Sequence, residues 1–314
     1  MPTTSSPDAA IPPALRDTLL AWYDLTGRDL SFRATADPYA VLVSELMAQQ
    51  TQAERAAAAW TAWMERWPTV RDLAAAPLAE VVRAWAGLGY NRRAVNLHRA
   101  AQVIVSERGG EVPSSVAELE SLPGVGAYTA RAVAAIAYRV PVGAVDTNVR
   151  RVLGRVAAGG PEAFTAAEMQ ALADAVVPPD RADAWTHALM DLGARACKPA
   201  KPRCEDCPVI AWCRYAAGDR PPAVAGSVGA AGSGAGSADT GRVPAPAFTT
   251  TRRWLRGRIV ERARNAGDEA WVTYGEAIGT HEASAVREAV LALASEGLLE
   301  AREGPEGPEA RLPG

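Results

Sequence analysis

The sequence predicts an all-α N-terminal domain, a linker and a small C-terminal α+β module. Apolar residues recur at the spacing of a helix through most of the first 215 residues, and strand patterns are scarce there. The composition changes sharply near residue 216: residues 216–247 are mostly Gly, Ala, Ser, Pro and Val, which is typical of a flexible linker. After this linker, helical patterns precede two short strand-like runs around Gly304.

The expected helices of the N-terminal domain begin at recognisable signals. The first long one, residues 38–60, follows Asp37, a favourable N-cap, and has proline at its first position. Leu42, Leu46, Ala53 and Ala57 give it an apolar stripe at helical spacing. The other expected helices are 78–86, 92–107, 115–120, 128–138, 168–176 and 182–192.

The C-terminal module has expected helices at 253–265, 273–278 and 282–295, followed by a hairpin within 298–312. Three helices followed by a hairpin is the element order of a winged helix. A small helical bundle is the alternative.

Charge and hydropathy restrict the kind of protein this chain can be. The net charge is −3, which argues against a uniformly basic nucleic-acid-binding protein, although arginines cluster locally in 92–99, 139–155 and 252–258. The first residues lack the basic start and apolar run of a signal peptide, and no window reaches the ~18 apolar residues that a membrane span requires. We therefore expect a cytoplasmic protein that does not bind membranes.

All four cysteines fall in one short segment with the spacing C-x6-C-x2-C-x5-C: Cys197, Cys204, Cys207 and Cys213. Four thiolates on one loop can surround a metal centre with sulfur ligands. Disulfides are disfavoured in a chain without an export signal. The spacing alone leaves structural zinc and an iron–sulfur cluster as alternatives.

A glycine-containing turn, residues 122–126, lies between two expected helices. Gly124 and Gly126 allow a tight turn and a close approach of the backbone to a ligand. The free N–H groups at the start of the next helix form an anion site, for which a DNA phosphate is the natural ligand. Taken alone, the turn fits an ordinary helix–helix connection equally well.

Two carboxylates stand in unusual surroundings. Glu45, Gln49 and Gln52 share one helix face because they are four and three positions apart, and the residues around Glu45 are apolar. On composition alone a solvated face is the simpler interpretation of Glu45. Asp146 follows an apolar run, where an unpaired carboxylate is costly, so it is expected to act in function, as the N-cap of the next helix, or both.

Residues 15–215 resemble MutY-type DNA glycosylases of the helix-hairpin-helix, or endonuclease III, superfamily. The resemblance rests on S-E-L-M-A-Q-Q-T-Q at 44–52, L-P-G-V-G-A-Y-T-A at 122–130, V-D-T-N-V-R-R-V at 145–152, and the cysteine loop. It implies a two-lobed helix-hairpin-helix glycosylase fold in which the four cysteines hold a 4Fe-4S cluster. The implied layout is an N-terminal helix on the cluster lobe (14–37), a six-helix lobe with the hairpin (38–138), the cluster lobe (139–215), the linker (216–247) and a winged-helix-like module (248–314).

The resemblance also implies a reaction, the hydrolysis of the bond between sugar and adenine when adenine is mispaired with 8-oxoguanine or guanine. A carboxylic acid must protonate the departing base, and an anion must stabilise the cationic sugar. In the family pattern Glu45 is the general acid, Asp146 stabilises the sugar with support from Asn148, and Tyr128 packs near the glutamate. Lyase-active relatives have a lysine at the position of Tyr128, so a monofunctional enzyme is implied.

The expected partner is double-stranded DNA that contains a mispair, bound by a monomer in the bacterial nucleoid. The resemblance places DNA contacts at Gln49, Gln50, Tyr90, Arg33 and the hairpin residues Leu122, Gly124, Val125 and Gly126. The chain resembles short forms without a Nudix-like lesion-checking domain, so Gln49, Gln50 and Tyr90, or the C-terminal module, would read the opposite base. Two alternatives are a thymine or uracil mismatch glycosylase on the same fold and a non-catalytic DNA-binding protein.

Overall fold

The computed structural model describes residues 10–219, 247–267 and 270–314, which form two compact units. The first unit comprises residues 1–45, 113–121 and 125–238; the second comprises 46–112, 122–124 and 239–314. Most of the predicted linker, 216–247, lies outside the described residues. No helix in the described part of the chain is both long and apolar enough to cross a membrane.

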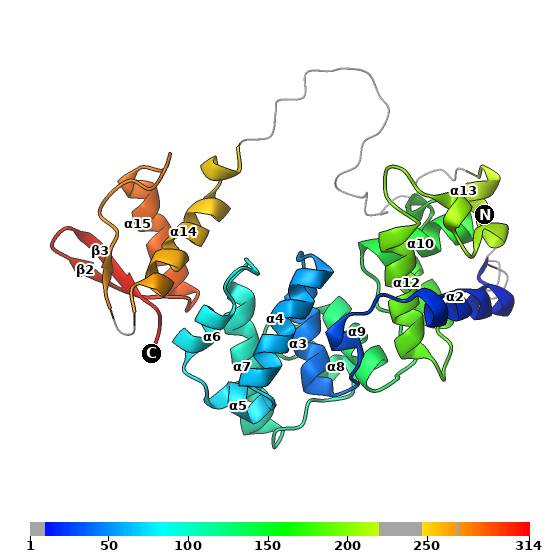
Figure 1. The fold of residues 1–314 in the computed structure, drawn as a ribbon, viewed down its shortest axis with the longest axis horizontal. Helices are drawn as coiled ribbons and strands as arrows, with labels where there is room; N and C mark the ends of the chain where they lie inside the picture. Colours follow the sequence, from blue (N-terminus) through cyan, green and yellow to red (C-terminus); the bar gives the residue numbers. More distant parts are fainter. Residues whose placement is uncertain (1–9, 220–246, 268–269) are drawn as a thin grey trace. The chain divides into compact units, whose positions relative to one another are not determined.

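The first unit is helical. Its core is one apolar cluster to which α2, α10, α11 and α12 contribute, and α12 packs against both α2 and α10 (Figure 1). Its helices are α2 (Pro13–Thr26), the first part of α3 (Pro38–Ala48), α8 (Val116–Glu120), α9 (Ala127–Ala137), α10 (Thr147–Ala158), α11 (Ala166–Ala175), α12 (Ala182–Arg195) and α13 (Arg214–Ala217).

Side-chain caps fix where several of these helices begin. Asp146 caps α10, and Thr165 with Glu168 forms a reciprocal capping box at the start of α11. Gly159 ends α10 in the left-handed conformation, with φ of 80°. Local sequence therefore determines the ends of the helix that carries Asp146.

The second unit contains helices from two distant parts of the chain and a small sheet. Its helices are α4 (Ala53–Arg66), α5 (Val70–Ala75), α6 (Leu78–Ala84), α7 (Arg92–Glu107), α14 (Arg252–Asn265) and α15 (Ala283–Ser295). The buried side chain of Trp63 packs edge-on against Trp67 and Trp85, and all three tryptophans are core residues.

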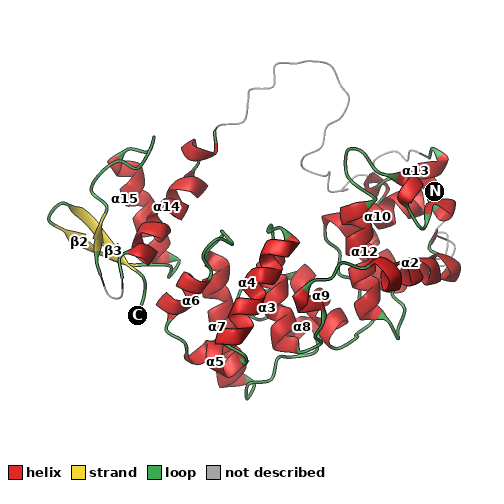
Figure 2. Cartoon of the chain, viewed as in Figure 1, coloured by secondary structure: helices red, strands yellow, loops and turns green. Residues whose placement is uncertain are grey.

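The sheet belongs to the C-terminal module and has the antiparallel order β1-β3-β2; Figure 2 labels β2 and β3. Its strands are β1 (Val272–Thr273), β2 (Glu300–Gly304) and β3 (Gly307–Arg311). Ala310 of β3 pairs with Val272 on one side and Ala301 on the other. The predicted hairpin around Gly304 is confirmed. The described part of the N-terminal domain contains no strand, as expected for an all-α domain.

Two predicted helices differ from the structure. The expected helix 38–60 is interrupted between Ala48 and Ala53, and Gln50 in the break has a φ of +52°. The guanidinium of Arg93 donates hydrogen bonds to the carbonyl oxygens of Leu46 and Gln49, at 2.7 and 2.5 Å. These bonds satisfy carbonyl groups at the helix end that a continuing helix would have bonded, so the tertiary partner outweighs the local helical pattern.

The prediction of a helix at 273–278 is wrong. Thr273 pairs with Glu309 in the sheet, and the N–H of Tyr274 donates to the carbonyl of Pro308 at 2.8 Å. The hydroxyl of Tyr274 is buried and donates to the carbonyl of Ile259 in α14 at 2.8 Å. The segment is extended because β3 and α14 satisfy its polar groups.

Candidate active site and DNA-binding elements

Glu45 lies in α3 and only 8% of its surface is exposed. Burial raises the pKa of this carboxyl to about 7; a hydrogen bond from the Tyr128 hydroxyl opposes the rise, and the charge of Asp146 adds to it. Glu45 is therefore protonated in a large fraction of molecules near neutral pH. Its interpretation as a solvated face is wrong, because the side chain is buried.

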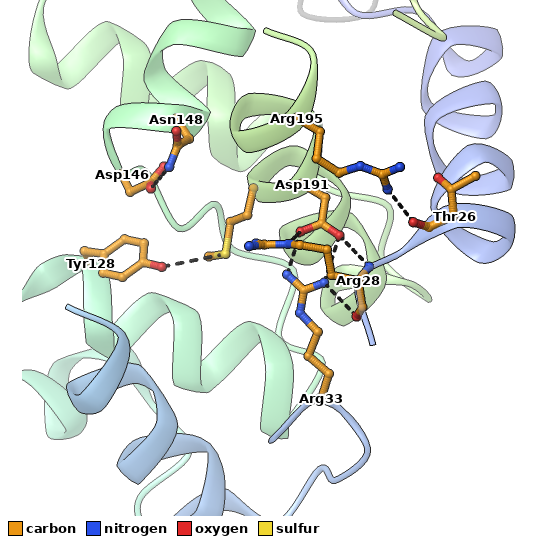
Figure 3. Close-up of polar contacts among 9 residues, drawn as sticks. Thr26, Arg28, Arg33, Tyr128, Asp146, Asn148, Asp191 and Arg195 are labelled. Carbon is orange, nitrogen blue, oxygen red and sulfur yellow. Dashed lines mark hydrogen bonds and ion pairs between the residues drawn. The ribbon is translucent and has the colours of Figure 1, made fainter. Parts of the chain in front are cut away.

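Tyr128 is the second residue of α9, so the turn that starts this helix positions its ring. Its hydroxyl lies 3.9 Å from the sulfur of Met190 in α12 (Figure 3). Burial raises the pKa of Tyr128 well above its ordinary value of 10, and the nearby carboxylates Glu45 and Asp146 act in the same direction. The phenol therefore stays neutral and serves as a hydrogen-bond donor.

Asp146 occupies the N-cap of α10, and both of its carboxylate oxygens have donors. The N–H of Val149 donates to Oδ1 at 2.7 Å, and the side-chain amide of Asn148 donates to Oδ2 at 2.8 Å (Figure 3). The N-terminus of α10 also favours an anion at this point. The predicted N-cap role is confirmed, and the amide of Asn148 holds the second carboxylate oxygen.

A second set of bonds connects Asn148 to the cysteine loop. The amide oxygen of Asn148 accepts a hydrogen bond from Arg151 at 2.8 Å. Arg151 also donates to the carbonyl oxygens of Gly193, at 2.9 Å, and Cys197, at 2.7 Å. One arginine therefore joins the start of α10, the end of α12 and the first residue of the cysteine loop.

Arg33 was predicted to contact DNA, but its side chain is only 7% exposed and forms a bidentate ion pair with Asp191, at 2.8 and 2.9 Å (Figure 3). Arg28 also binds Asp191, through its backbone N–H at 2.9 Å and its Nε at 2.7 Å. Burial alone would raise the pKa of Asp191, yet the bonds and charges of both arginines bring it down to about 2. The burial of the Arg33 side chain argues against the predicted DNA contact. Its ion pair instead joins residues 31–33 to Asp191 of α12.

The sequence interpretation assigned no role to Asp191, Arg28 or Met190. Asp191 is fully buried in α12, a helix with apolar residues on both sides of it, and this was the available signal. His187, one turn earlier, is also buried, and this burial lowers its pKa to about 3. The positive charge of Arg33 partly opposes the rise of the Glu45 pKa.

The hairpin presents backbone groups rather than side chains. Leu122 and Val125 are buried, with 2% and 6% of their surface exposed. Gly124 has a φ of +78°, and a Cβ at this position would lie 2.5 Å from the Cβ of Asn96. Gly126 is the N-cap of α9 and has no side chain to cap the first turn, and a helix N-terminus of this kind favours an anion. Any DNA contact at Leu122 or Val125 therefore uses the backbone.

The second unit contains the other predicted DNA contacts: Gln49, Gln50 and Tyr90 line one groove. Gln50 and Tyr90 both have a positive φ, of +52° and +45°. Such conformations are costly for residues other than glycine and persist where the surroundings enforce them. Glu45, Tyr128, Asp146 and Asn148 all belong to the first unit.

All four cysteines are free thiols and partly buried. Cys197, Cys207 and Cys213 pack against the core of the first unit. The guanidinium of Arg155 lies 3.5 Å from the sulfur of Cys197, and the Cys213 thiol donates to the Arg155 carbonyl at 3.7 Å. Burial raises the pKa of the Cys207 thiol to about 11. Within the described residues, no three His, Cys, Asp or Glu side chains are placed to hold a single metal ion.

Comparison with known proteins identifies the family. The model of the HhH-GPD superfamily base excision DNA repair proteins matches residues 43–179. The chain is 41% identical over 280 residues to the adenine DNA glycosylase of Mycobacterium tuberculosis, covering 85% of this chain and 87% of that protein. The chain belongs to the adenine DNA glycosylase family. The predicted resemblance is therefore confirmed.

Two further similarities are consistent with this family. The adenine DNA glycosylase of Mycolicibacterium smegmatis is 49% identical over 199 residues, which cover 63% of this chain and 68% of that protein. Among solved structures, a thermostable thymine-DNA glycosylase matches with a TM-score of 0.61 and 30% sequence identity, over 65% of this chain and 96% of that chain. The adenine glycosylase family thus shares its fold with an enzyme named for a different base.

Proposed function

We propose that this member of the adenine DNA glycosylase family excises adenine mispaired with 8-oxoguanine or guanine in double-stranded DNA. The observation that carries the proposal is Glu45, a buried carboxyl with its pKa raised to about 7 and Tyr128 and Asp146 beside it. A general acid is most effective when its pKa lies near the working pH. Relatives at 41% and 49% identity are named adenine DNA glycosylases.

The residues divide the reaction between an acid and an anion. Protonated Glu45 gives its proton to the departing adenine as the bond to the sugar breaks, because a neutral base is the better leaving group. Asp146, held by the N–H of Val149 and by Asn148, stabilises the positive charge that develops on the sugar. The target base must leave the helical stack to reach these groups. A water then adds to the sugar cation, and Asp146 accepts the proton that the water loses.

The reaction is proposed to be monofunctional. A strand-cleaving lyase needs an amine that forms a Schiff base with the sugar. Position 128 carries a phenol, and its raised pKa makes it a neutral donor rather than a nucleophile.

We also propose that Cys197, Cys204, Cys207 and Cys213 hold a 4Fe-4S cluster. All four are free thiols, three of them (Cys197, Cys207 and Cys213) pack against the same core, and Cys197 and Cys213 both contact Arg155. Four cysteine thiolates on one loop are a ligand set that would hold a 4Fe-4S cluster. A structural zinc would take the same four ligands. Iron analysis and the visible absorption of the purified protein would distinguish the two.

When bound, the cluster would cross-link the loop and so serve a structural role. The protein already supports this loop from α10: Arg155 donates to the carbonyls of Lys198 and Pro199, both at 2.8 Å, and its guanidinium lies 4.5 Å from the ring centre of Tyr215. We further propose that the protein acts as a monomer and that residues 248–314 form a winged-helix-like module with one helix fewer than expected.

Base release from defined duplexes tests the substrate. We expect the enzyme to release adenine from duplexes with adenine opposite 8-oxoguanine or guanine, and no thymine or uracil from mismatches with guanine. The fold similarity to a thymine-DNA glycosylase makes that enzyme class the relevant competitor. Release of thymine without release of adenine would overturn the proposal.

A further inference from the structure

The second unit contains a groove of about 1050 Å³ that the proposed reaction does not use. Residues 86–96 form one wall together with Gln49 and Gln50, and α14 with the preceding Phe248 forms the other. We call it the α14 groove. Two hydrogen bonds from Arg264 of α14, to the carbonyl of Val82 at 2.9 Å and to the side chain of Asn91 at 2.8 Å, hold the walls together. A shared apolar core, which includes Val82, Val95 and Leu255, lies beside them.

The groove is strongly basic, although the whole chain has a net charge of −3. Six arginines and two glutamates line it. Both glutamates are already neutralised, because Glu296 pairs with Arg256 at 2.6 Å and Glu261 pairs with Arg258 at 2.5 Å. The exposed Arg92 and Arg253 have no carboxylate partner among the described residues. The groove therefore has an excess of positive charge that an anionic ligand would balance.

Aromatic rings stand beside these cations. Five large hydrophobic side chains are exposed in the described part of the chain, and two of them, Tyr90 and Phe248, line the groove, at 40% and 59% exposure. The guanidinium carbon of Arg253 lies 4.0 Å from the centre of the Tyr90 ring and 5.9 Å from that of Phe248. Arg253 also donates to the Tyr90 hydroxyl at 2.8 Å, which helps to hold Tyr90 in its left-handed conformation.

Arginines interleaved with exposed rings match the chemistry of a nucleic acid strand. Phosphates bind guanidinium groups, and the flat faces of bases stack on aromatic rings and on arginine. An acidic peptide would satisfy the charges but would leave Tyr90 and Phe248 without a flat partner. The combination therefore favours a nucleotide ligand over an acidic protein segment.

We propose that the α14 groove is a DNA-binding site in which Arg92 and Arg253 bind backbone phosphates and Phe248 and Tyr90 stack against a base. The C-terminal module then supplies one wall of the DNA-binding surface. This inference rests on the proposed function for the choice of DNA as the nucleic acid. It adds Phe248, Arg92 and Arg253 to the DNA contacts expected from the sequence.

The test measures DNA binding by the full-length protein without turnover. Each variant is made in a Glu45→Gln background, and its affinity for a fluorescent duplex with an adenine·8-oxoguanine mispair is measured at several salt concentrations. Arg253→Gln should weaken binding about tenfold and reduce the slope of log affinity against log salt by about 0.9, the value for one lost phosphate contact. Arg262→Gln is the matched control, because Arg262 is exposed on the same helix but does not line the groove.

A second variant separates stacking from charge. Phe248→Leu keeps the charge of the groove, so it should weaken binding about fivefold to tenfold, as expected for a lost base stack, and leave the salt slope unchanged. Thermal melting of each variant checks that the protein is folded. If Arg253→Gln and Phe248→Leu bind DNA with the same affinity and salt slope as Arg262→Gln, the groove does not bind DNA.

The proposed substrate and the groove can fail separately. Groove-dependent binding together with no adenine release by the protein with Glu45 intact would overturn the substrate and keep the groove. Adenine release together with groove-independent binding would overturn the groove alone. Competition by poly-glutamate as effective as that by single-stranded DNA of equal charge would also overturn the inference, because the rings would then contribute nothing.

Discussion

The proposed catalytic residues and the α14 groove use the same kinds of side chain in opposite ways. Around Glu45 the polar groups are partly or fully buried, and the charged ones are paired within the protein: the Arg33 side chain is 7% exposed and bidentate with Asp191. In the groove Arg253 is exposed, lies against aromatic rings and has no carboxylate partner among the described residues. The difference suggests a rule: an arginine indicates a site for an anionic ligand when the fold provides it with no carboxylate partner.

The largest expected effect concerns Glu45 itself. Glu45→Gln keeps the size and burial of the side chain but removes the acid, so single-turnover adenine release should fall by about 10²–10⁴-fold. Quench-flow or gel-based base-release assays at saturating enzyme would measure it. DNA affinity should stay within about threefold, because Glu45 is not among the proposed phosphate contacts. A variant that retains its rate would show that burial at this position is structural.

Loss of the buried ion pairs that Asp191 forms with Arg28 and Arg33 should strongly lower the stability of the protein. Asp191→Ala leaves Arg28 and Arg33 without their shared carboxylate, and the loss should be about 3–5 kcal/mol in the free energy of unfolding. Urea denaturation would measure it. The matched control is Asp24→Ala, which breaks the exposed pair with Arg181 and should cost less than about 1 kcal/mol. Equal losses for the two variants would contradict the distinction between buried and surface arginines.

The raised pKa of Glu45 should also appear as a pH-dependent cost to stability. The pKa of Glu45 rises from 4.5 to about 7 on folding, so between these pH values the folded state binds more protons than the unfolded state. The free energy of unfolding therefore falls as the pH rises through this range. Above pH 7 the cost approaches about 3 kcal/mol. Glu45→Gln should therefore be more stable than the parent protein at pH 8, and the advantage should shrink by pH 5. A pH-independent difference would mean that the pKa of Glu45 is ordinary.

The smallest expected effect is on the pH profile of the reaction. If protonated Glu45 is the acid, as proposed, kcat/KM should decline with an apparent pKa of about 7 and then fall tenfold for each pH unit. DNA binding through the α14 groove should not decline with kcat/KM above pH 7, since arginines stay protonated in this pH range. If the rate and the DNA affinity both fell above pH 7, the proposal that Glu45 acts in catalysis and the α14 groove in DNA binding would be contradicted.

The positions of most helices were predictable because their signals are local. The apolar spacing of α7, the Asp146 cap of α10 and the hairpin around Gly304 all lie within a few residues of the elements that they define. The two errors had long-range causes. Arg93 bonds the carbonyls at the end of α3, and β3 pairs with residues 272–273. Residues that lie far apart in the sequence decide such cases.

The sequence by itself determined the family, the four-cysteine loop and the candidate residues Glu45, Tyr128, Asp146 and Asn148, because these belong to short contiguous motifs. The tertiary structure decided what their surroundings make them. It buried Glu45 so that its pKa rises, neutralised Arg33 with Asp191, and brought α14 beside residues 86–96 to form a basic groove. The physical reason is that desolvation and charge balance depend on which distant side chains come together, and spacing along the chain does not record this.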